Sequence, residues 1–440
     1  MKSENQLMEK IISLCKRRGF VFPGSEIYGG LANSWDYGPL GVELKNNIKQ
    51  LWWKRFVHQR DDMVGIDAAL IMNPKVWEAS GHLKEFSDPL VECKKCKRRF
   101  RADHIDPNYE NTNSFDKKIK CPDCSGELSE PRQFNLMLKT FLGPAEEKAD
   151  VAYFRPETAQ AMFVDFKNVL ETSRKKLPFG IAQIGKAFRN EITPGNFIFR
   201  TREFEQMEIE YFVKEEEWKN SFEHWQKESW NWMTGVLGLK KEHIHELEVP
   251  DGERAHYSKR TIDFEYDYPF GRKELYGLAY RANFDLKNHF KEAPYQDIEA
   301  GENLYPHVIE PTFGVDRSVL AVLCDAYTEE AERIVLKLKP ALAPYKVAVF
   351  PLLKNKPELV EKAKEVYEHL KKEFTTIFDD RGNIGKRYYS QDEIGTPYCV
   401  TVDFDTLEKA DVTIRDRNTA KQERIKISEL TSFIKEKIYD

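Results

Sequence analysis

Apolar and polar positions follow two different rhythms along the chain, and these predict helices and strands in different regions. In residues 43–56 the apolar positions recur every three to four residues, while lysines occupy the opposite side. The apolar positions are Leu44, Ile48, Leu51, Trp52 and Phe56. Because this spacing puts apolar side chains on one helix face, it predicts an amphipathic helix that packs against a core.

The middle of the chain has the rhythm of strands. Extended runs over residues 181–212 are interrupted by Thr193–Asn196, which has the composition of a tight turn, so we expect a long antiparallel hairpin. A second extended pair covers residues 260–270 and 273–281. Residues 306–311 follow as a strand, and Gly314 begins a helix. These segments predict a mixed, mostly antiparallel sheet flanked by helices, which is an α+β fold.

A second domain is predicted after the proline-bounded segment Pro340–Pro344. From there the rhythm is strand, helix, strand, which is typical of an α/β unit of about 100 residues. Residues 90–130 lack core periodicity, which favours a small inserted module. We therefore expect one domain over residues 1–339 with an insertion at 90–130, followed by a second domain over residues 340–440.

Composition narrows the class of protein. Hydrophobic residues make up 41% and charged residues 32% of the 440 residues, which is typical of a folded soluble chain rather than a disordered one. The net charge is −5, so any nucleic-acid partner must bind to local basic patches. Met1 is not followed by a secretory signal pattern, and no apolar run reaches the roughly 18 residues of a membrane span. We expect a cytoplasmic protein with no membrane partner.

Four of the seven cysteines form two CxxC pairs, Cys93 with Cys96 and Cys121 with Cys124. Four thiolates in two such pairs predict a closed tetrahedral Zn²⁺ site, which is structural rather than catalytic. The alternatives are free buried thiols or a redox pair. The other three cysteines are scattered among apolar residues, which favours a reducing compartment.

Alternation along residues 200–208 places charged side chains and one aromatic ring on a single strand face. That face carries Arg200, Arg202, Phe204, Gln206 and Glu208. Guanidinium groups bind phosphate oxygens and an aromatic plane stacks on a base, so the face suits a nucleotide. A solvated sheet face with cross-strand ion pairs is the alternative. The nearby Gly180–Ala187 lacks the Ser or Thr that a P-loop uses to bind Mg²⁺, so we reject a P-loop.

Three further charged positions indicate chemistry. Gly314 precedes a helix whose first turn carries Arg317, so backbone donors, the helix dipole and a guanidinium can face one anion. The alternative is that Arg317 pairs with a neighbouring acid. Glu274 and Glu310 lie in otherwise apolar strands, where an acid is either paired or functional.

Several segments together resemble one family. One pair of segments, Phe188–Glu191 and Phe199–Phe204, resembles motif 2 of the class II aminoacyl-tRNA synthetases. Gly314–Arg317 resembles motif 3 of the same class. The homodimeric type of glycyl-tRNA synthetase is similar to this chain at Trp35–Gly41, Trp77–His82, Arg155–Gln160, Phe204–Glu208 and Asp392–Pro397. Because these segments extend over nearly the whole chain, the resemblance is specific.

This resemblance implies a fold, a reaction and partners. The implied fold is a class II catalytic domain on an antiparallel sheet, with a zinc-binding insertion and a C-terminal anticodon-binding domain. The helix from Glu43 and the strand ending at Pro74 would form a homodimer interface. The implied enzyme activates glycine with ATP and Mg²⁺ to glycyl-adenylate, releases pyrophosphate, and transfers glycine to the 3′ end of tRNA(Gly).

The resemblance also implies roles for single residues. Arg189 would hold the ATP α-phosphate, Arg317 the γ-phosphate and Glu274 the Mg²⁺, and these are the implied catalytic residues. Phe204 would stack on adenine. The full set implied for ATP is Arg189, Asn190, Glu191, Phe199, Arg200, Thr201, Arg202, Glu203, Phe204, Glu274, Leu275, Gly314, Val315, Asp316 and Arg317.

The implied glycine site has acids around the substrate ammonium group, namely Glu157, Glu208 and Glu310. Arg101 and Arg281 would lie near its carboxylate. The full set implied for glycine is Arg101, Glu157, Phe204, Glu205, Gln206, Met207, Glu208, Arg281, Glu310, Pro311, Thr312, Phe313 and Gly314. The chain departs from the family at Thr312, where serine is common.

Two other functions stay open on the sequence. One is a non-catalytic paralogue that binds nucleic acid as an accessory subunit. Such a protein is expected to lose the motif arginines, which are present here as Arg189 and Arg317. The other is a synthetase for a different amino acid of the same subclass.

Overall fold

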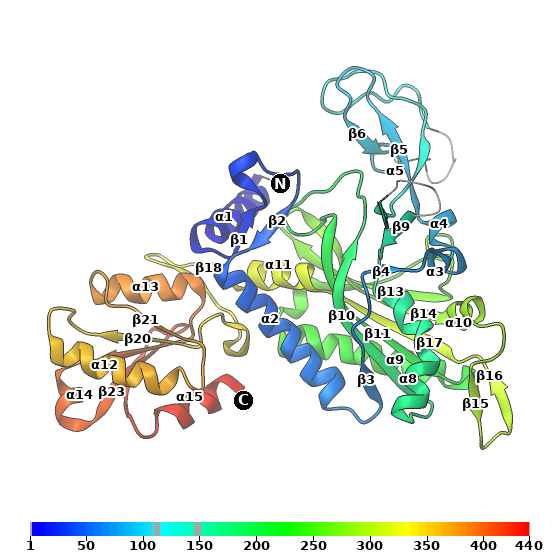
Figure 1. Ribbon diagram of the computed structural model, residues 1–440. Helices are drawn as coiled ribbons and strands as arrows, with labels where there is room; N and C mark the ends of the chain where they lie inside the picture. The colour runs from blue at the N-terminus through cyan, green and yellow to red at the C-terminus, as the bar shows by residue number, and fades with distance from the viewer. Residues whose placement is uncertain (1, 107, 110–114, 145–150, 440) are drawn as a thin grey trace.

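The computed structural model describes residues 2–106, 108–109, 115–144 and 151–439, and its largest element is a seven-stranded sheet (Figure 1). The strand order is β12-β13-β14-β17-β11-β10-β3, and every neighbouring pair is antiparallel except β10 with β3. The strands are β3 (Met63–Gly65), β10 (Phe179–Phe188), β11 (Glu203–Val213), β12 (Ile244–Glu248), β13 (Arg260–Tyr268), β14 (Gly271–Ala282) and β17 (His307–Gly314). The predicted mixed, mostly antiparallel sheet is confirmed.

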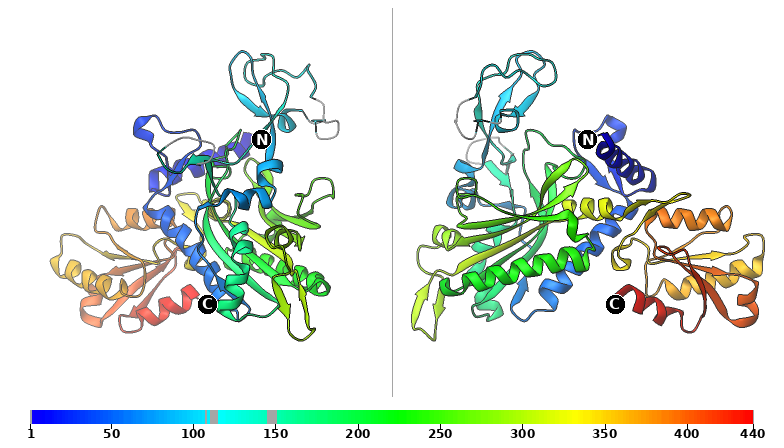
Figure 2. Two further views of the ribbon diagram at one scale, coloured as in Figure 1. Left: turned by 45° about the vertical axis from the view of Figure 1, so that its right-hand side comes forward. Right: turned by 180° about the vertical axis from the view of Figure 1, so that it is seen from behind.

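Alternate residues of the central strands face two different helix layers. Met207 and Ile209 of β11 belong to the core that includes α2 (Pro39–Trp53), α9 (Trp218–Asn231) and α11 (Val315–Ala326). Figure 2 shows α9 lying along this side of the sheet. Phe212 packs on the opposite face with α7 (Ala159–Val164) and α8 (Phe166–Ser173). Because side chains alternate along a strand, the even-numbered residues of β11 share the face of α7.

Helix α2 carries the apolar stripe that the sequence predicts. Leu44, Ile48 and Trp52 are fully buried, and the helix passes into a π turn over Lys54–His58 that buries Phe56. The helix begins at Pro39, before the expected Glu43, because Gly38 precedes a proline at the first helical position, where proline fits well. A short strand does end just before Pro74, namely β4 (Ile71–Met72), and Pro74 itself begins helix α3 (Pro74–Ala79). Strand β4 pairs with β9 (Val151–Phe154) in a separate small sheet, whereas the strand that joins the main sheet is β3.

The cysteine-bearing insertion projects from the body of the protein as a small sheet of its own (Figure 1). Its strand order is β6-β5-β7. The elements are β5 (Ser87–Glu92), β6 (Arg99–Arg101), α5 (Ala102–Ile105) and β7 (Arg132–Asn135). Within the expected range 90–130, residues 107 and 110–114 lie outside the described residues. Among the described residues its core is small, with Val91, Ala102 and Phe115 as the buried members.

The C-terminal part forms a five-stranded sheet of order β21-β20-β22-β23-β24 with its own apolar core. Strand β20 is parallel to both neighbours, which is the pattern expected from a strand-helix-strand rhythm. The elements are β20 (Val347–Pro351), α12 (Pro357–Leu370), β21 (Thr376–Phe378), α13 (Ile384–Ile394), β22 (Tyr398–Val402), α14 (Phe404–Lys409), β23 (Asp411–Asp416), β24 (Gln422–Lys426) and α15 (Leu430–Tyr439).

Several polar contacts join the C-terminal part to the rest of the chain, and two of them involve Asn47 and Arg333. Asn47 on α2 donates to the carbonyl of Leu342 at 3.1 Å, in the connecting segment. Arg333 donates to the buried Asp392 at 2.7 Å, and Arg415 donates to the same carboxylate at 2.8 Å. Asp392, in the segment Asp392–Pro397, therefore links the two parts.

The remaining elements are the long helix α1 and a set of short helices and strands. They are α1 (Lys2–Arg18), β1 (Val21–Pro23), β2 (Trp35–Tyr37), β4 (Ile71–Met72), α4 (His82–Glu85), β8 (Lys139–Phe141), β9 (Val151–Phe154), α10 (Phe284–His289), β15 (Tyr295–Asp297), β16 (Glu302–Leu304), β18 (Tyr327–Glu329) and β19 (Ile334–Leu336). In the described part of the chain, no helix has the length and apolar character needed to cross a membrane.

Candidate active site

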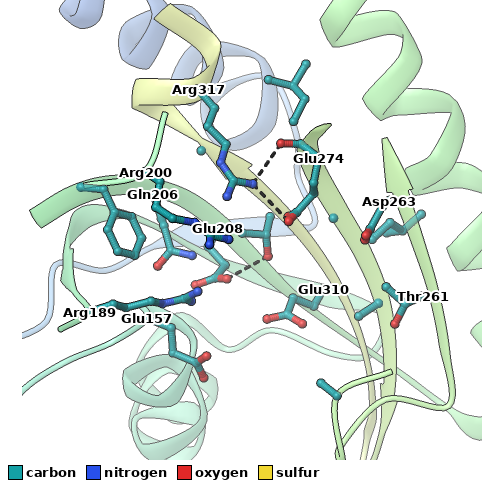
Figure 3. Close-up of a pocket in the computed structure, with 18 of the residues that line it drawn as sticks. Glu157, Arg189, Arg200, Gln206, Glu208, Thr261, Asp263, Glu274, Glu310 and Arg317 are labelled. Atoms are coloured by element: carbon teal, nitrogen blue, oxygen red, sulfur yellow. Dashed lines mark hydrogen bonds and ion pairs between the residues drawn. The ribbon is translucent and has the colours of Figure 1, made fainter. Parts of the chain in front are cut away.

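A cavity of about 380 Å³ opens on the α7 face of the large sheet (Figure 3). Strand β11 contributes Phe204, Gln206 and Glu208, and the paired strand β17 contributes Glu310 and Thr312. All five have even numbers, so their side chains leave the two antiparallel strands on the same face. The strand alternation that predicted a functional face is thus what builds the cavity floor.

At one end of the cavity two arginines lie near aromatic rings. The Cζ of Arg189 is 5.3 Å from the ring centroid of Phe204, and the Cζ of Arg317 is 4.5 Å from that of Phe199. Nη1 of Arg317 lies 3.1 Å from Oε2 of Glu274 and donates to its backbone carbonyl at 3.0 Å. The positive charge of Arg317 lowers the pKa of the Glu274 carboxyl. This end therefore combines two cations, an ionised acid and flat rings.

Asp316 and Glu205 border the same end and tie helix α2 to the sheet. Lys45 on α2 lies 3.0 Å from Oε2 of Glu205 and 3.1 Å from Oδ1 of Asp316. Asp316 also accepts from the Tyr37 hydroxyl at 2.5 Å and from the backbone N–H of Glu205 at 2.8 Å. Because their charges are already paired, these two acids position the first turn of α11 and the start of β11.

At the other end three buried carboxylates converge, from Glu157, Glu208 and Glu310. Glu208 accepts hydrogen bonds from the hydroxyls of Thr158 and, at 2.8 Å, Thr312. The hydroxyl of Thr312 thus takes part in the site. Burial and the charge of Glu157 raise the pKa of Glu208. Burial likewise raises the pKa of Glu310, to about 8.

Glu157 is held by the segment Arg155–Gln160 and by His82. Gln160 donates to Oε1 of Glu157 at 3.0 Å, and Nε2 of His82 lies 3.3 Å from Oε2. Burial opposes ionisation of Glu157, but His82 and Arg281 outweigh it, and the pKa of Glu157 is lowered. Glu157 is thus the acid most firmly kept ionised, next to two acids that resist ionisation.

The two arginines expected near the glycine carboxylate do not line the cavity. Arg281 is fully buried beneath the cavity, where it donates to both oxygens of Asp285 and, at 2.8 Å, to Glu310. Arg101 lies in the insertion and donates to Asp88 at 2.7 Å and to Asp103 at 2.5 Å. Among the described residues, neither lines the cavity. Arg281 therefore acts on the site through Glu310, and Arg101 interacts electrostatically with the lining residue Glu191.

Several other expected residues also lie outside the cavity lining. Some of these residues have odd numbers on β11 or β17, so their side chains leave the strand on the opposite face. Others lie in the loop that connects β10 to β11. The side chains of Met207, Phe313 and Val315 pack in the core on the far face, and the remaining residues outside the lining are Asn190, Arg202, Glu203 and Pro311. The residues that the structure does bring to the cavity are Glu157, Arg189, Glu191, Phe199, Arg200, Thr201, Phe204, Glu205, Gln206, Glu208, Glu274, Leu275, Glu310, Thr312, Gly314, Asp316 and Arg317.

Sequence reasoning missed the side of the cavity formed by residues 249–263. Tyr257 covers the buried guanidinium, with its ring centroid 3.6 Å from the Cζ of Arg281. Asp263 on β13 faces Glu274, and burial and the charge of Glu274 raise the pKa of Asp263 to about 7. Residues 249–257 have no periodicity that marks them, but the alternating acids at 263, 265 and 267 were a usable signal.

Comparisons with known proteins agree with this geometry. Residues 141–326 match the family model "tRNA synthetase class II core domain (G, H, P, S and T)", and residues 346–437 match the model "Anticodon binding domain". A protein named glycine–tRNA ligase from Alkaliphilus oremlandii is 53% identical over 458 residues, covering 98% of each chain. Another of that name, from Clostridium acetobutylicum, is 53% identical over 469 residues, covering 100% of each. The chain belongs to the glycine–tRNA ligase family.

A third protein named glycine–tRNA ligase, from Bacillus thuringiensis subsp. konkukian, is 52% identical over 457 residues, covering 98% of this chain and 99% of its own. In this glycine–tRNA ligase family member, the part of the chain that matches the class II core model contains most strands of the large sheet and the residues that line the cavity. The anticodon-binding model coincides with the five-stranded C-terminal sheet. The predicted family, fold class and enzyme class are confirmed.

The four cysteines of the insertion meet in space. The Sγ atoms of Cys93 and Cys124 are 3.5 Å apart, those of Cys96 and Cys121 are 3.7 Å apart, and all four lie within 4.8 Å of one another. Zn–S bonds of about 2.3 Å in a tetrahedron require S–S distances of roughly 3.8 Å, so the cluster fits Zn²⁺. A hydrogen bond from the backbone N–H of Cys96 lowers the pKa of the Cys93 thiol to about 6, which favours the thiolate that a metal binds.

Proposed function

We propose that this protein catalyses the two-step reaction of a glycine–tRNA ligase: activation of glycine with ATP, then transfer of glycine to the 3′ end of tRNA(Gly). One observation supports this most strongly. Full-length similarity to proteins named glycine–tRNA ligase coincides with a single cavity that has two arginines at one end and three buried glutamates at the other.

In the first step the glycine carboxylate attacks the α-phosphorus of ATP and pyrophosphate leaves. The carboxylate is ionised at neutral pH, so the protein needs no general base and acts by alignment and charge stabilisation. Arg189 holds the α-phosphate and Phe204 supplies the plane for adenine. Mg²⁺ bound with ATP supplies positive charge at the phosphates, and Glu274, with Asp263 facing it, provides the carboxylate to hold it.

Glycine recognition depends on the acid end of the cavity. Glu157, Glu208 and Glu310 surround the ammonium group of the substrate and bind its charge. Because a hydrophobic pocket discriminates one methylene by only about 1–3 kcal/mol, crowded carboxylates are a better means of excluding alanine. The hydroxyls of Thr158 and Thr312 hold Glu208 in the volume that a β-methyl group would need.

The other parts of the chain serve the transfer step and assembly. Residues 1–339 act as the catalytic domain, residues 340–440 bind the anticodon of tRNA(Gly), and the insertion within 90–130 is stabilised by Zn²⁺. The protein works as a homodimer in the cytoplasm. The loop after β1 exposes Ile27 at 88%, Tyr28 at 87% and Leu31 at 66%, and such an apolar patch supports an interface with a second copy.

ATP–pyrophosphate exchange, measured with glycine, alanine, serine, proline and threonine in turn, tests the function. We expect glycine alone to support rapid exchange, followed by charging of tRNA(Gly). Exchange with another amino acid would make the protein a synthetase of different specificity. Binding of tRNA without any exchange would make it a non-catalytic paralogue, although Arg189 and Arg317 both stand in the cavity.

A further inference from the structure

A fourth glutamate lies beneath the cavity. Glu210 on β11 is fully buried, and the register of β11 with β17 pairs Glu208 with Thr312 and Tyr211 with Ile309. Glu210 therefore stands directly opposite Glu310 on the adjacent strand. A carboxylate oxygen of Glu210 lies within 4.8 Å of those of Glu208 and Glu310. Among the described residues neither oxygen of Glu210 has a hydrogen-bond donor.

The cation near Glu210, Arg281, is already hydrogen-bonded to other carboxylates. The charged groups that face it are Glu310, Arg281, Glu208 and Asp285. Arg281 uses Nε and Nη2 on Asp285 and Nη1 on Glu310. Two ionised carboxylates opposite each other on neighbouring strands, away from water, repel strongly, so such a pair retains a proton. Because Glu310 has the arginine and Glu210 has no donor, the proton belongs on Glu210.

We propose that Glu210 is a positioning residue of the glycine site: a neutral carboxylic acid whose O–H donates to Glu310 and orients that carboxylate toward the substrate ammonium group. This inference rests on the proposed function. Burial and the neighbouring Glu310 raise the pKa of Glu210 well above its usual range, in agreement with the geometry. Glu210 thus keeps its proton over the pH range in which Glu310 ionises.

Two variants of Glu210 separate this role from a charged or a merely structural one. Glu210→Leu removes the donor, and we expect the glycine KM to rise about tenfold or more, because one hydrogen bond to a carboxylate is lost, while the ATP KM stays the same. Glu210→Gln retains an uncharged donor and restores the glycine KM to within about threefold of wild type. A rise in glycine KM with Glu210→Gln as large as with Glu210→Leu would overturn the proposal.

The pH profile of 1/KM for glycine gives a readout that a packing role does not move. This profile follows the ionisation of Glu310. If Glu210 is neutral, Glu210→Gln has the same pH profile as the wild type. If Glu210 is ionised, removing its charge lowers the pKa of Glu310 and moves the profile by about one pH unit or more to lower pH, which would contradict the proposal.

If Glu210→Leu does not fold, infrared spectroscopy of wild type and Glu210→Gln tests the protonation of Glu210 instead. At a pH above the titration of Glu310, we expect wild type to show a protonated-carboxyl band in the folded state that Glu210→Gln lacks; an unchanged band would overturn the proposal. The wild-type exchange assay keeps this test separate from the proposed function. Wild type without glycine-dependent exchange refutes the function, whereas failure of the Glu210 tests in an active enzyme refutes only the role of Glu210.

Discussion

Arg317 and Glu274 form an ion pair inside the cavity, with 3.1 Å between Nη1 and Oε2 (Figure 3). In the proposed reaction these groups bind different parts of one ligand, the γ-phosphate and the Mg²⁺ that accompanies it. The pair therefore holds each side chain near its place before ATP arrives. Both alternatives that the sequence left open for Arg317, a partner for a neighbouring acid and a ligand for an anion, fit the same geometry.

Replacement of this arginine tests the pairing. In Arg317→Ala the anchor for the γ-phosphate and the partner of Glu274 are both lost, so we expect kcat/KM for ATP to fall by about 10²-fold. The glycine KM should change far less, because Arg317 lies at the other end of the cavity. Arg272→Ala is the matched control. Arg272 is an exposed arginine on the same strand as Glu274, and it pairs with Asp267. Equal effects of the two substitutions on the ATP step would contradict the assignment.

The hydroxyl of Thr312 can be tested separately from its methyl group. Thr312→Val keeps the shape but removes the donor to the buried Glu208, and we expect the glycine KM to rise about tenfold, which corresponds to roughly 1.4 kcal/mol. Thr312→Ser keeps the donor and should stay within about threefold of wild type. Steady-state exchange with glycine at saturating ATP measures both. If valine is tolerated as well as serine, the bond to Glu208 does not contribute to binding.

Glycine binding should depend on pH through Glu310. Its pKa is raised to about 8, so below that pH the carboxyl is largely protonated and attracts an ammonium group weakly. We expect the glycine KM to fall as pH rises from about 6.5 to about 8, by up to tenfold per unit, because only the ionised form binds well. In Glu310→Gln the KM should be higher and nearly independent of pH over this range. A wild-type KM that is flat or rises over the same range would contradict the assignment.

The cluster of four cysteines predicts a specific loss of metal. Cys96→Ser removes one of four converging thiols, and we expect metal analysis to find about one Zn²⁺ per chain in wild type and much less in the variant. Since the described core of the insertion is small, hydrogen exchange in residues 87–101 should also accelerate. Cys399→Ser, a buried thiol in the C-terminal sheet, should retain the metal. Equal zinc contents in Cys96→Ser and wild type would contradict a zinc site at this cluster.

Periodicity in the sequence predicted the parts of the fold that depend on local pattern. The stripe from Leu44 to Phe56 and the alternation from Phe204 to Glu208 both appear in the structure as expected. The same alternation, applied strictly, would have excluded Met207 and Phe313 from the cavity. It would also have pointed to Glu210, which shares the parity of Glu208.

Other features depend on partners that are distant in the sequence. Arg281 and Arg101 carry the same charge, and only the tertiary structure shows that each is already paired with an acid elsewhere in the sequence, Arg281 with Glu310 and Arg101 with Asp88. Tyr257 lies in a loop without periodicity, so nothing local marks its position over Arg281. Sequence pattern therefore identified the strand faces of the site, whereas the ion pairs behind them required coordinates.

Glycine-dependent ATP–pyrophosphate exchange by wild type and Arg189→Ala tests the central claim most directly. Although Nε of Arg189 donates to the Pro156 carbonyl at 3.0 Å, the side chain is only partly buried, so its loss should change the melting temperature little. We predict rapid exchange in wild type and a decrease of about 10²- to 10³-fold in the variant, the usual effect of removing one fixed charge at a transition state. Wild-type activity retained by a folded Arg189→Ala protein would contradict the account.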